Sequence, residues 1–276
     1  MRISIDHETS YGYDRPARFI VQILRQTPRS TANQHVHDWR IDLDVDARLR
    51  QGEDAYGNII HTLYTDAPTE RLTIRVSGEV DTNDTGGVLP AAPEKLSPLV
   101  YRRETLLTHA TPKVTAFAGM AAMPTTLDTL HRLNHLVHQE IAFEVGATTA
   151  THTAAEVLAL RRGVCQDHAH LFIACARKLG VPARYISGHL LRADGETHQD
   201  AAHAWAEAFV EDLGWVGFDP ANGVSPTEAY VRVAAGLDYL GAAPVRGAAY
   251  GGGSEHLSVR LTVRQIHASQ QSQQQA

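Results

Sequence analysis

A cysteine in the second half of the chain has the surroundings of a nucleophile. Cys165 follows a glycine and a valine, and after it small and apolar residues recur with helical periodicity as far as Leu179. We therefore expect Cys165 in the first turn of a helix that stops at Gly180. The free N–H groups and partial positive charge of a helix N-terminus favour a thiolate and can stabilise an oxyanion. A lone cysteine is more often structural, so the downstream residues decide its meaning.

Two strand-like segments then bring a histidine close to an aspartate. Residues 202–210 alternate strictly between small and larger side chains, with His203 on the larger face, and a turn leads into a strand that ends at Asp219. If the hairpin centres near residue 211, His203 faces Asp219 directly, and a shift of two leaves them diagonal and within reach. The spacing predicts a triad in which His203 takes the proton of Cys165 and Asp219 orients the imidazole.

A second helical segment carries a different set of candidate ligands. After the N-cap signal at residues 125–126, five apolar residues form one stripe, at Leu127, Leu130, Leu133, Val137 and Ile141. His131, His135 and His138 share the flank of this stripe, so a zinc site has to be considered. No acidic or cysteine side chain at a matching offset completes the set, and a solvated flank is the favoured interpretation.

Composition limits the function classes. The chain has 276 residues and a net charge of −6, which argues against sequence-independent nucleic-acid binding. It has no apolar run long enough to span a membrane and no signal-peptide pattern, so we expect a cytoplasmic protein without a membrane partner. The two cysteines, Cys165 and Cys175, lie on one predicted helix and cannot form a disulfide framework.

The chain divides by its periodicity. Short alternating segments up to about residue 84 predict a sandwich- or barrel-like antiparallel domain, and the proline- and glycine-rich stretch after it is typical of a boundary. We predict a β-rich domain over 1–90, a linker over 91–110, a catalytic domain over 111–267 and a disordered tail over 268–276. Which sheet the last strand joins is left open.

Four ordered motifs resemble the bacterial transglutaminase-like superfamily, which includes suspected cysteine proteases. They are GVCQDHAHL at 163–171, GVPARYISG at 180–188, AHAWAE at 202–207 and GWVGFDP at 214–220. HETSYGY at 7–13 and DAYGN at 54–58 resemble the family's β-rich N-terminal domain. The resemblance implies an α+β fold, with a cysteine-bearing helix packed on an antiparallel sheet in a papain- or transglutaminase-like core.

The resemblance also implies roles for individual residues. Cys165 is the expected nucleophile, His203 the base and Asp219 the orienting carboxylate. Trp205 and Gln166 are expected to contact the substrate or the oxyanion, with a packing role for Trp205 as the alternative, and Glu207 is expected to be structural. His189 and Leu237 depart from the family pattern, where tyrosine and arginine are usual; these departures affect expected substrate contacts and leave the triad intact.

Together these features predict an enzyme that transfers acyl groups from peptide or carboxamide substrates through a thioacyl intermediate. Hydrolysis as a peptidase or amidase is favoured over cross-linking, and no metal or other cofactor is needed. A homo-oligomer is possible. The main alternative is a non-catalytic binding or assembly module on the same fold. A zinc hydrolase that uses the three helical histidines is a third and weaker hypothesis.

Overall fold

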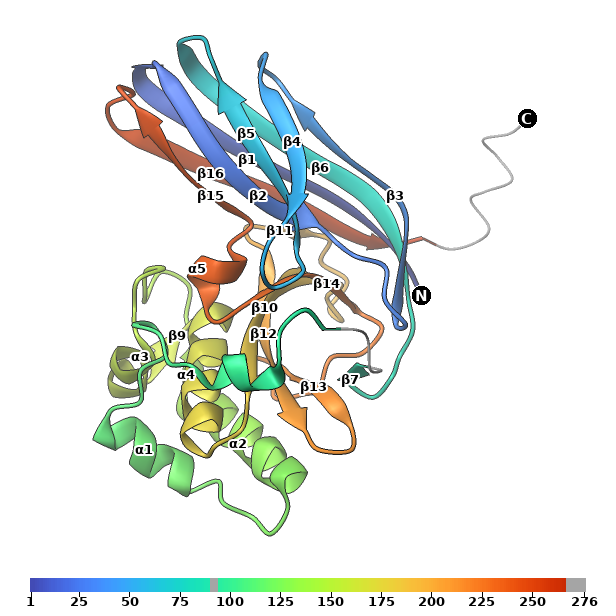
Figure 1. Cartoon of the computed structure of the whole chain (residues 1–276), viewed down its shortest axis with the longest axis vertical. Helices are drawn as coiled ribbons and strands as arrows, with labels where there is room; N and C mark the ends of the chain where they lie inside the picture. Colours follow the sequence, from blue (N-terminus) through green and yellow to red (C-terminus); the bar gives the residue numbers. More distant parts are fainter. Residues whose placement is uncertain (90–93, 267–276) are drawn as a thin grey trace, which may run out of the picture.

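A β sandwich lies above a second unit, in which helices pack on a third sheet (Figure 1). The computed structural model describes residues 1–89 and 94–266. The predicted α+β class is confirmed, because antiparallel sheets and a separate group of helices make up the chain. The tail predicted over 268–276 lies outside the described residues, as does the part of the predicted linker before residue 94.

Two sheets make the sandwich. In spatial order, the first contains β11 (His198–Gln199), β16 (Glu255–Gln265), β1 (Arg2–Ala17), β6 (Thr69–Thr82) and β3 (Gln34–Leu43). The second contains β15 (Val245–Tyr250), β2 (Phe19–Thr27), β5 (Ile59–Thr65) and β4 (Arg48–Glu53). Strict alternation in β1 and β2 turns every second side chain inward, where residues such as Ile20, Leu63 and Ile74 form a core between the sheets.

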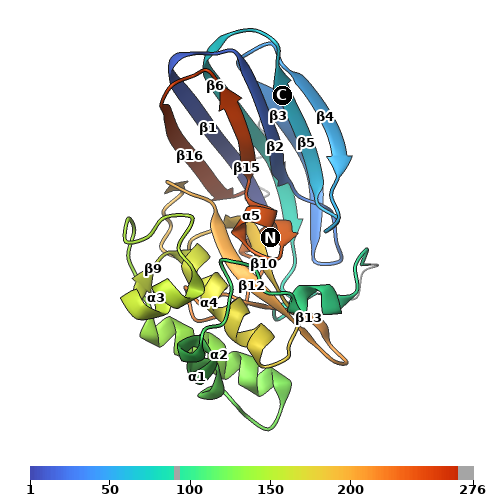
Figure 2. The same cartoon turned by 60° about the vertical axis from the view of Figure 1, so that its left-hand side comes forward.

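Strands from the two ends of the chain lie side by side in this sandwich. Both views show the C-terminal strands β15 and β16 next to β2 and β1 (Figures 1 and 2). Strands β1 and β16 pair in a continuous register, from Ile3 opposite Gln265 to Tyr13 opposite Glu255. The predicted catalytic domain over 111–267 was therefore wrong in its last part, because residues 245–265 complete the N-terminal sandwich. The open question of which sheet the last strand joins is answered by the same pairing.

The lower unit is built on a third sheet. Its strands, in spatial order, are β14 (Tyr230–Gly236), β10 (Ala183–Leu190), β12 (His203–Val210), β13 (Gly214–Phe218) and β7 (Val88–Leu89). A small parallel pair, β8 (Ala142–Phe143) and β9 (Arg162–Gly163), lies beside it. The helical elements are η1 (Pro98–Arg102), α1 (Pro112–Gly119), α2 (Thr126–Glu140), α3 (Ala154–Leu160), α4 (Cys165–Lys178) and α5 (Tyr239–Ala242).

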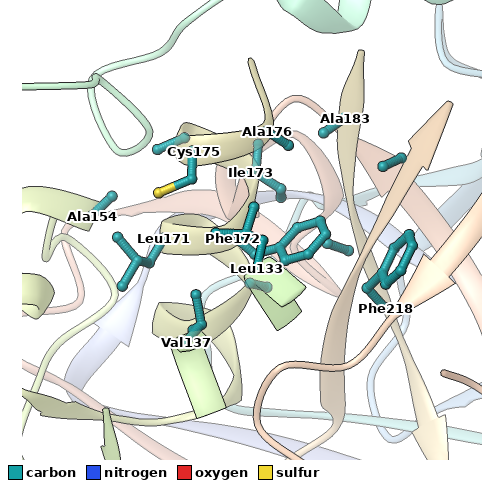
Figure 3. Close-up of a cluster of buried hydrophobic side chains, with 14 of the residues drawn as sticks. Leu133, Val137, Ala154, Leu171, Phe172, Ile173, Cys175, Ala176, Ala183 and Phe218 are labelled. Atoms are coloured by element: carbon teal, nitrogen blue, oxygen red, sulfur yellow. The ribbon is translucent and has the colours of Figure 1, made fainter. Parts of the chain in front are cut away.

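Helix α4 lies at the centre of the lower core. It begins at Cys165, and Gly180 after its end adopts a φ of +87°, which glycine tolerates best. Phe172 on α4 stacks on Phe218 of β13 with ring centroids 5.1 Å apart (Figure 3). The predicted apolar stripe of α2 packs into the same core, and Thr125 caps that helix by accepting a hydrogen bond from the Asp128 N–H.

The segment before the helices is packed against the lower unit. Tyr101 in η1 is 1% exposed and meets Trp215 of β13 edge to face, with centroids 5.1 Å apart. The described part of the predicted linker is therefore anchored to the sheet through an aromatic contact.

Two amide side chains of the sandwich cap the outer edge of β14. Gln34 accepts a hydrogen bond from the Arg232 N–H at 2.9 Å and donates to the Arg232 carbonyl at 2.8 Å. Asn58 makes the same pair with Ala235, at 2.8 and 2.7 Å. A register shift in β14 between these two contacts turns the backbone groups of both residues outward. We call Gln34 and Asn58 the amide clamp.

Candidate active site

The first turn of α4 is fixed by Asp167. Its carboxylate accepts hydrogen bonds from the Val164 N–H at 2.8 Å and from the Thr148 hydroxyl at 2.6 Å. A Cβ at Gly163 would lie 2.6 Å from this carboxylate, so the close approach needs glycine. Cys165 therefore begins α4 in a defined position, and its side chain is partly exposed at the edge of the helical core.

The neighbours of Asp167 tie this turn to the surrounding loops. The ring nitrogens of His168 lie 2.9 Å from the Val164 carbonyl oxygen and 3.0 Å from that of Ile141, at the end of α2. The Gln166 side-chain amide donates to the Ala150 carbonyl at 3.3 Å. That contact turns the Gln166 side chain toward the loop before α3, and its predicted contact with the oxyanion stays a prediction.

His203 lies beside Asp219 and close to Cys165. Its Nε2 is 2.6 Å from Asp219 Oδ2. Burial alone would lower the pKa of His203, but the interactions with Asp219 and with Cys165 outweigh burial and raise that pKa to about 10. The arrangement therefore favours a protonated imidazole next to the thiol, which is the electrostatic condition for a thiolate.

Asp219 is saturated with hydrogen-bond donors. The residue is fully buried, and Oδ2 accepts from Asn222 Nδ2 and the Tyr230 hydroxyl, each at 2.7 Å, in addition to His203. Oδ1 accepts from the backbone N–H groups of Ala221 at 3.1 Å and Asn222 at 3.3 Å. Burial raises the pKa of Asp219, and these hydrogen bonds, led by that of His203, more than compensate, so the net pKa is lowered. The carboxylate is therefore ionised.

The hairpin that carries these residues differs in register from the simplest expectation. Glu207 pairs with Gly217 and Ala206 with Phe218, which centres the turn on Asp212 instead of Glu211. Asp212 adopts a φ of +71° and Gly214 one of +85°, and the turn is centred one residue later than expected. The pairing of His203 directly opposite Asp219 was wrong; the two lie two positions out of register, in the diagonal arrangement that still permits their contact.

Trp205 and Glu207 lie behind His203 on the same face of β12. The Trp205 ring is 2% exposed, stacks beside His203 with centroids 6.2 Å apart, and meets Tyr230 edge to face at 5.4 Å. This packing supports His203, while the predicted substrate contact of Trp205 stays a prediction. Glu207 is fully buried and pairs with Arg184 at 2.6 Å and Arg232 at 2.8 Å, as expected for a structural carboxylate.

The three helical histidines form no site of their own. His131 packs edge to face on Phe218 at 5.2 Å, and the Nδ1 of His138 is 3.1 Å from the Ala221 carbonyl oxygen. All three histidines of the set, with His135, are exposed on α2. Within residues 1–89 and 94–266, no group of three His, Cys, Asp or Glu side chains is arranged to hold a metal ion. The zinc-hydrolase hypothesis therefore has no support from the geometry.

Two residues of this site were missed by the sequence analysis. Tyr230 begins β14, which β10 and β12 separate from β13 in the sheet, and its hydroxyl donates to Asp219. Asn222 lies in the loop just after Asp219. An asparagine three residues after a strand-ending aspartate is a usable local signal. Tyr230 gives no such signal, because its contact depends on the order of strands in the sheet.

Comparisons with known proteins point to transglutaminase-like families over most of the chain. The model of the bacterial transglutaminase-like N-terminal region matches residues 3–81, and that of the transglutaminase-like superfamily matches residues 115–220. An uncharacterised protein of Mycobacterium tuberculosis is 30% identical over 275 residues, which cover 90% of this chain and 88% of that one. A protein-glutamine gamma-glutamyltransferase of Pseudomonas aeruginosa is 29% identical over 174 residues, which cover 55% of this chain but 25% of that protein.

A solved structure shares the whole architecture. The crystal structure of a suspected cysteine protease from Cytophaga hutchinsonii superposes with a TM-score of 0.79. The match covers 97% of this chain and 91% of that one at 20% sequence identity, so it establishes the common fold. In the part of the chain that the structure describes, no helix is both long and apolar enough to cross a membrane.

Proposed function

Because the chain belongs to the bacterial transglutaminase-like superfamily, a group with the fold of thiol-dependent enzymes, we propose that it transfers acyl groups from peptide or carboxamide substrates through Cys165. The observation that carries the proposal is the position of His203, which is 2.6 Å from a buried carboxylate and close enough to Cys165, at a helix N-terminus, for the two side chains to interact. The suspected protease activity of the Cytophaga protein and the name of the Pseudomonas relative support acyl-transfer chemistry.

The first half of the reaction forms a thioacyl-enzyme. His203 takes the proton of the Cys165 thiol, and the thiolate attacks the substrate carbonyl carbon to form a C–S bond. Negative charge develops on the carbonyl oxygen, where the free backbone N–H groups of the first turn of α4 can donate to it. The C–N bond then breaks as His203 returns its proton to the leaving amine or ammonia.

The second half regenerates the thiol. His203 takes a proton from water, the resulting hydroxide oxygen attacks the thioester carbonyl, and the C–S bond breaks as the proton returns to Cys165. An amine in place of water would give transamidation with the same proton transfers. We favour water as the acceptor, since bacterial relatives resemble proteases and the family has no evident amine-donor motif. Throughout, Asp219 holds the imidazole in one orientation.

The first test measures the reactivity of Cys165 without assuming a substrate. The rate of iodoacetamide alkylation is followed against pH by peptide mass spectrometry, with Cys175 as an internal control. Cys175 is fully buried, and burial raises its pKa far above the ordinary range, so it should stay inert. We expect Cys165 to react well below the ordinary thiol pKa of about 8.5, and the His203→Ala variant to lose this reactivity.

A second measurement separates the two acceptors. A glutamine-containing peptide library is incubated with the protein in water and with added hydroxylamine, and products are identified by mass. Free acid as the main product supports hydrolysis, whereas hydroxamate that exceeds the acid at low hydroxylamine indicates amine transfer.

The alkylation test decides whether the protein is an enzyme at all. If Cys165 is as inert as Cys175 in the folded protein at every pH, the enzyme proposal fails, and the binding-module alternative takes its place.

A further inference from the structure

Asp219 is shared between His203 and a tyrosine that does not belong to the proposed triad. The Tyr230 hydroxyl donates to the same oxygen, Oδ2, that lies 2.6 Å from His203 Nε2. Burial raises the pKa of Tyr230 far above its ordinary value, so the hydroxyl remains a donor at any pH at which the protein works. A neutral donor that competes for a catalytic carboxylate reduces the charge available to the imidazole.

The position of Tyr230 is fixed from several sides. Its ring is 9% exposed and touches Trp205 edge to face, with centroids 5.4 Å apart. Two residues before it, the Glu228 carbonyl accepts a hydrogen bond from the Thr82 hydroxyl; two residues after it, Arg232 is held by Gln34. Thr82 and Gln34 both belong to the sandwich. The N-terminal domain therefore holds the strand that carries Tyr230 on both sides of this residue.

We propose that Tyr230 is a positioning residue of the active site, which shares Asp219 with His203 and thereby weakens the hold of the carboxylate on the imidazolium proton. This inference rests on the proposed function, because a shared Asp219 matters only if His203 transfers protons during a reaction. His203 has to accept a proton from the thiol and then release it to the leaving amine. A carboxylate that interacted with His203 alone would favour the first transfer and hinder the second.

The direction of the effect follows from the contacts of Oδ2. Removal of the Tyr230 hydroxyl leaves two side-chain donors, His203 and Asn222, on an oxygen that now has three. One hydrogen bond to a charged group corresponds to about one to two pKa units on that group. The Asp219 charge is shared among several donors, so only part of this effect falls on His203. We expect the pKa of His203 to rise by about half a unit or more. A tyrosine that acts only in packing would leave this pKa unchanged when it becomes phenylalanine.

The experiment is an NMR titration of the His203 Cε1–H signal in the full-length chain. It uses a Cys165→Ala background, so that the thiol does not titrate together with the imidazole, and a His203→Gln variant identifies the signal. Tyr230→Phe is compared with the background alone. The matched control is Tyr13→Phe, because Tyr13 is 8% exposed and its hydroxyl has no hydrogen-bond partner among the described residues.

The proposal requires the His203 pKa to rise in Tyr230→Phe and to stay unchanged in Tyr13→Phe. If Tyr230→Phe fails to fold, Asn222→Ala serves instead, because Asn222 is exposed and donates to the same oxygen, and it should shift the pKa in the same direction. An unchanged or lowered His203 pKa, or an equal rise in the control, overturns the proposal. The titration needs no thiol and no substrate, so its outcome is independent of the alkylation test that decides the proposed function.

Discussion

A fall in pH from 6 to 5 is expected to destabilise the fold through three buried histidines. His7 and His189, which meet edge to face at 5.6 Å between the two units, are each 4% exposed, and His170 beneath α5 is fully buried. Burial lowers the pKa of His7 and of His170 to about 4 and that of His189 to about 3. Unfolded histidine titrates near pH 6.5, so in this interval the unfolded chain binds protons that the folded chain does not, and stability falls with the pH.

The size of the loss follows from these pKa values. Between pH 6 and pH 5 each of the three histidines should remove about 1 kcal/mol, or about 3 kcal/mol together, because one pKa unit corresponds to about 1.4 kcal/mol. The contribution of His203 to the pH dependence has the opposite sign, since its folded pKa is raised to about 10. Below pH 6.5, however, His203 is charged in both the folded and the unfolded state, so its contribution to stability changes little. Carboxylates with lowered pKa values, such as Asp219, start to contribute only as the pH falls toward 4.

The assay is urea unfolding at pH 6 and pH 5, followed by tryptophan fluorescence. A loss of about 3 kcal/mol would be a large part of the 5–15 kcal/mol typical of a folded protein, so it is easily measured. The His189→Gln variant should reduce the difference between the two pH values by about a third. The control is His198→Gln, whose side chain is 82% exposed and which should leave the difference unchanged. An equal free energy of unfolding at both pH values would refute the reasoning.

Two further predictions concern the support of the active site. Glu207→Gln should lower the free energy of unfolding by about 3 kcal/mol, because the buried Arg184 guanidinium keeps only Glu94 as a carboxylate partner and Arg232 loses its ion pair; chemical denaturation measures this loss. Glu207→Asp, which keeps the charge, should lose less; an equal loss would mean that shape and not charge matters there. Asn58→Ala should leave the N–H and carbonyl groups of Ala235 without their clamp partner, at a cost of about 1–3 kcal/mol. Amide hydrogen exchange at Ala235 should then become faster, and unchanged exchange would show that the clamp does not hold β14.

The proposed catalytic residues could be predicted from the sequence because their placement depends on short segments. Cys165 takes its position from the periodicity of one helix and from the glycine that stops it. His203 and Asp219 meet because a single hairpin connects them, and an error of one residue in the turn still left them in contact. Local geometry of this kind depends on turn and helix signals that are visible within about ten residues.

The features that were missed depend on contacts between distant parts of the chain. Tyr230 contacts Asp219 although β10 and β12 lie between β14 and β13 in the sheet, and strand order has no local signal. The pairing of β16 with β1 joins residues more than 240 positions apart, and an alternating strand fits either sheet equally well. Gln34 and Asn58 look like ordinary polar residues near turns, since their role is defined by the backbone that they meet in another domain.

The amide clamp has a consequence for how this protein can meet extended chains. The open edge of a sheet can pair with almost any extended segment, which is a hazard for self-association and also a common way to bind peptides. Gln34 and Asn58 occupy backbone positions of β14 that a strand added at this edge would otherwise use. A peptide therefore cannot join the lower sheet along β14 at Arg232 and Ala235 while the sandwich is in place. The N-terminal domain thus blocks strand addition at that edge, and an extended substrate has to approach Cys165 by another route.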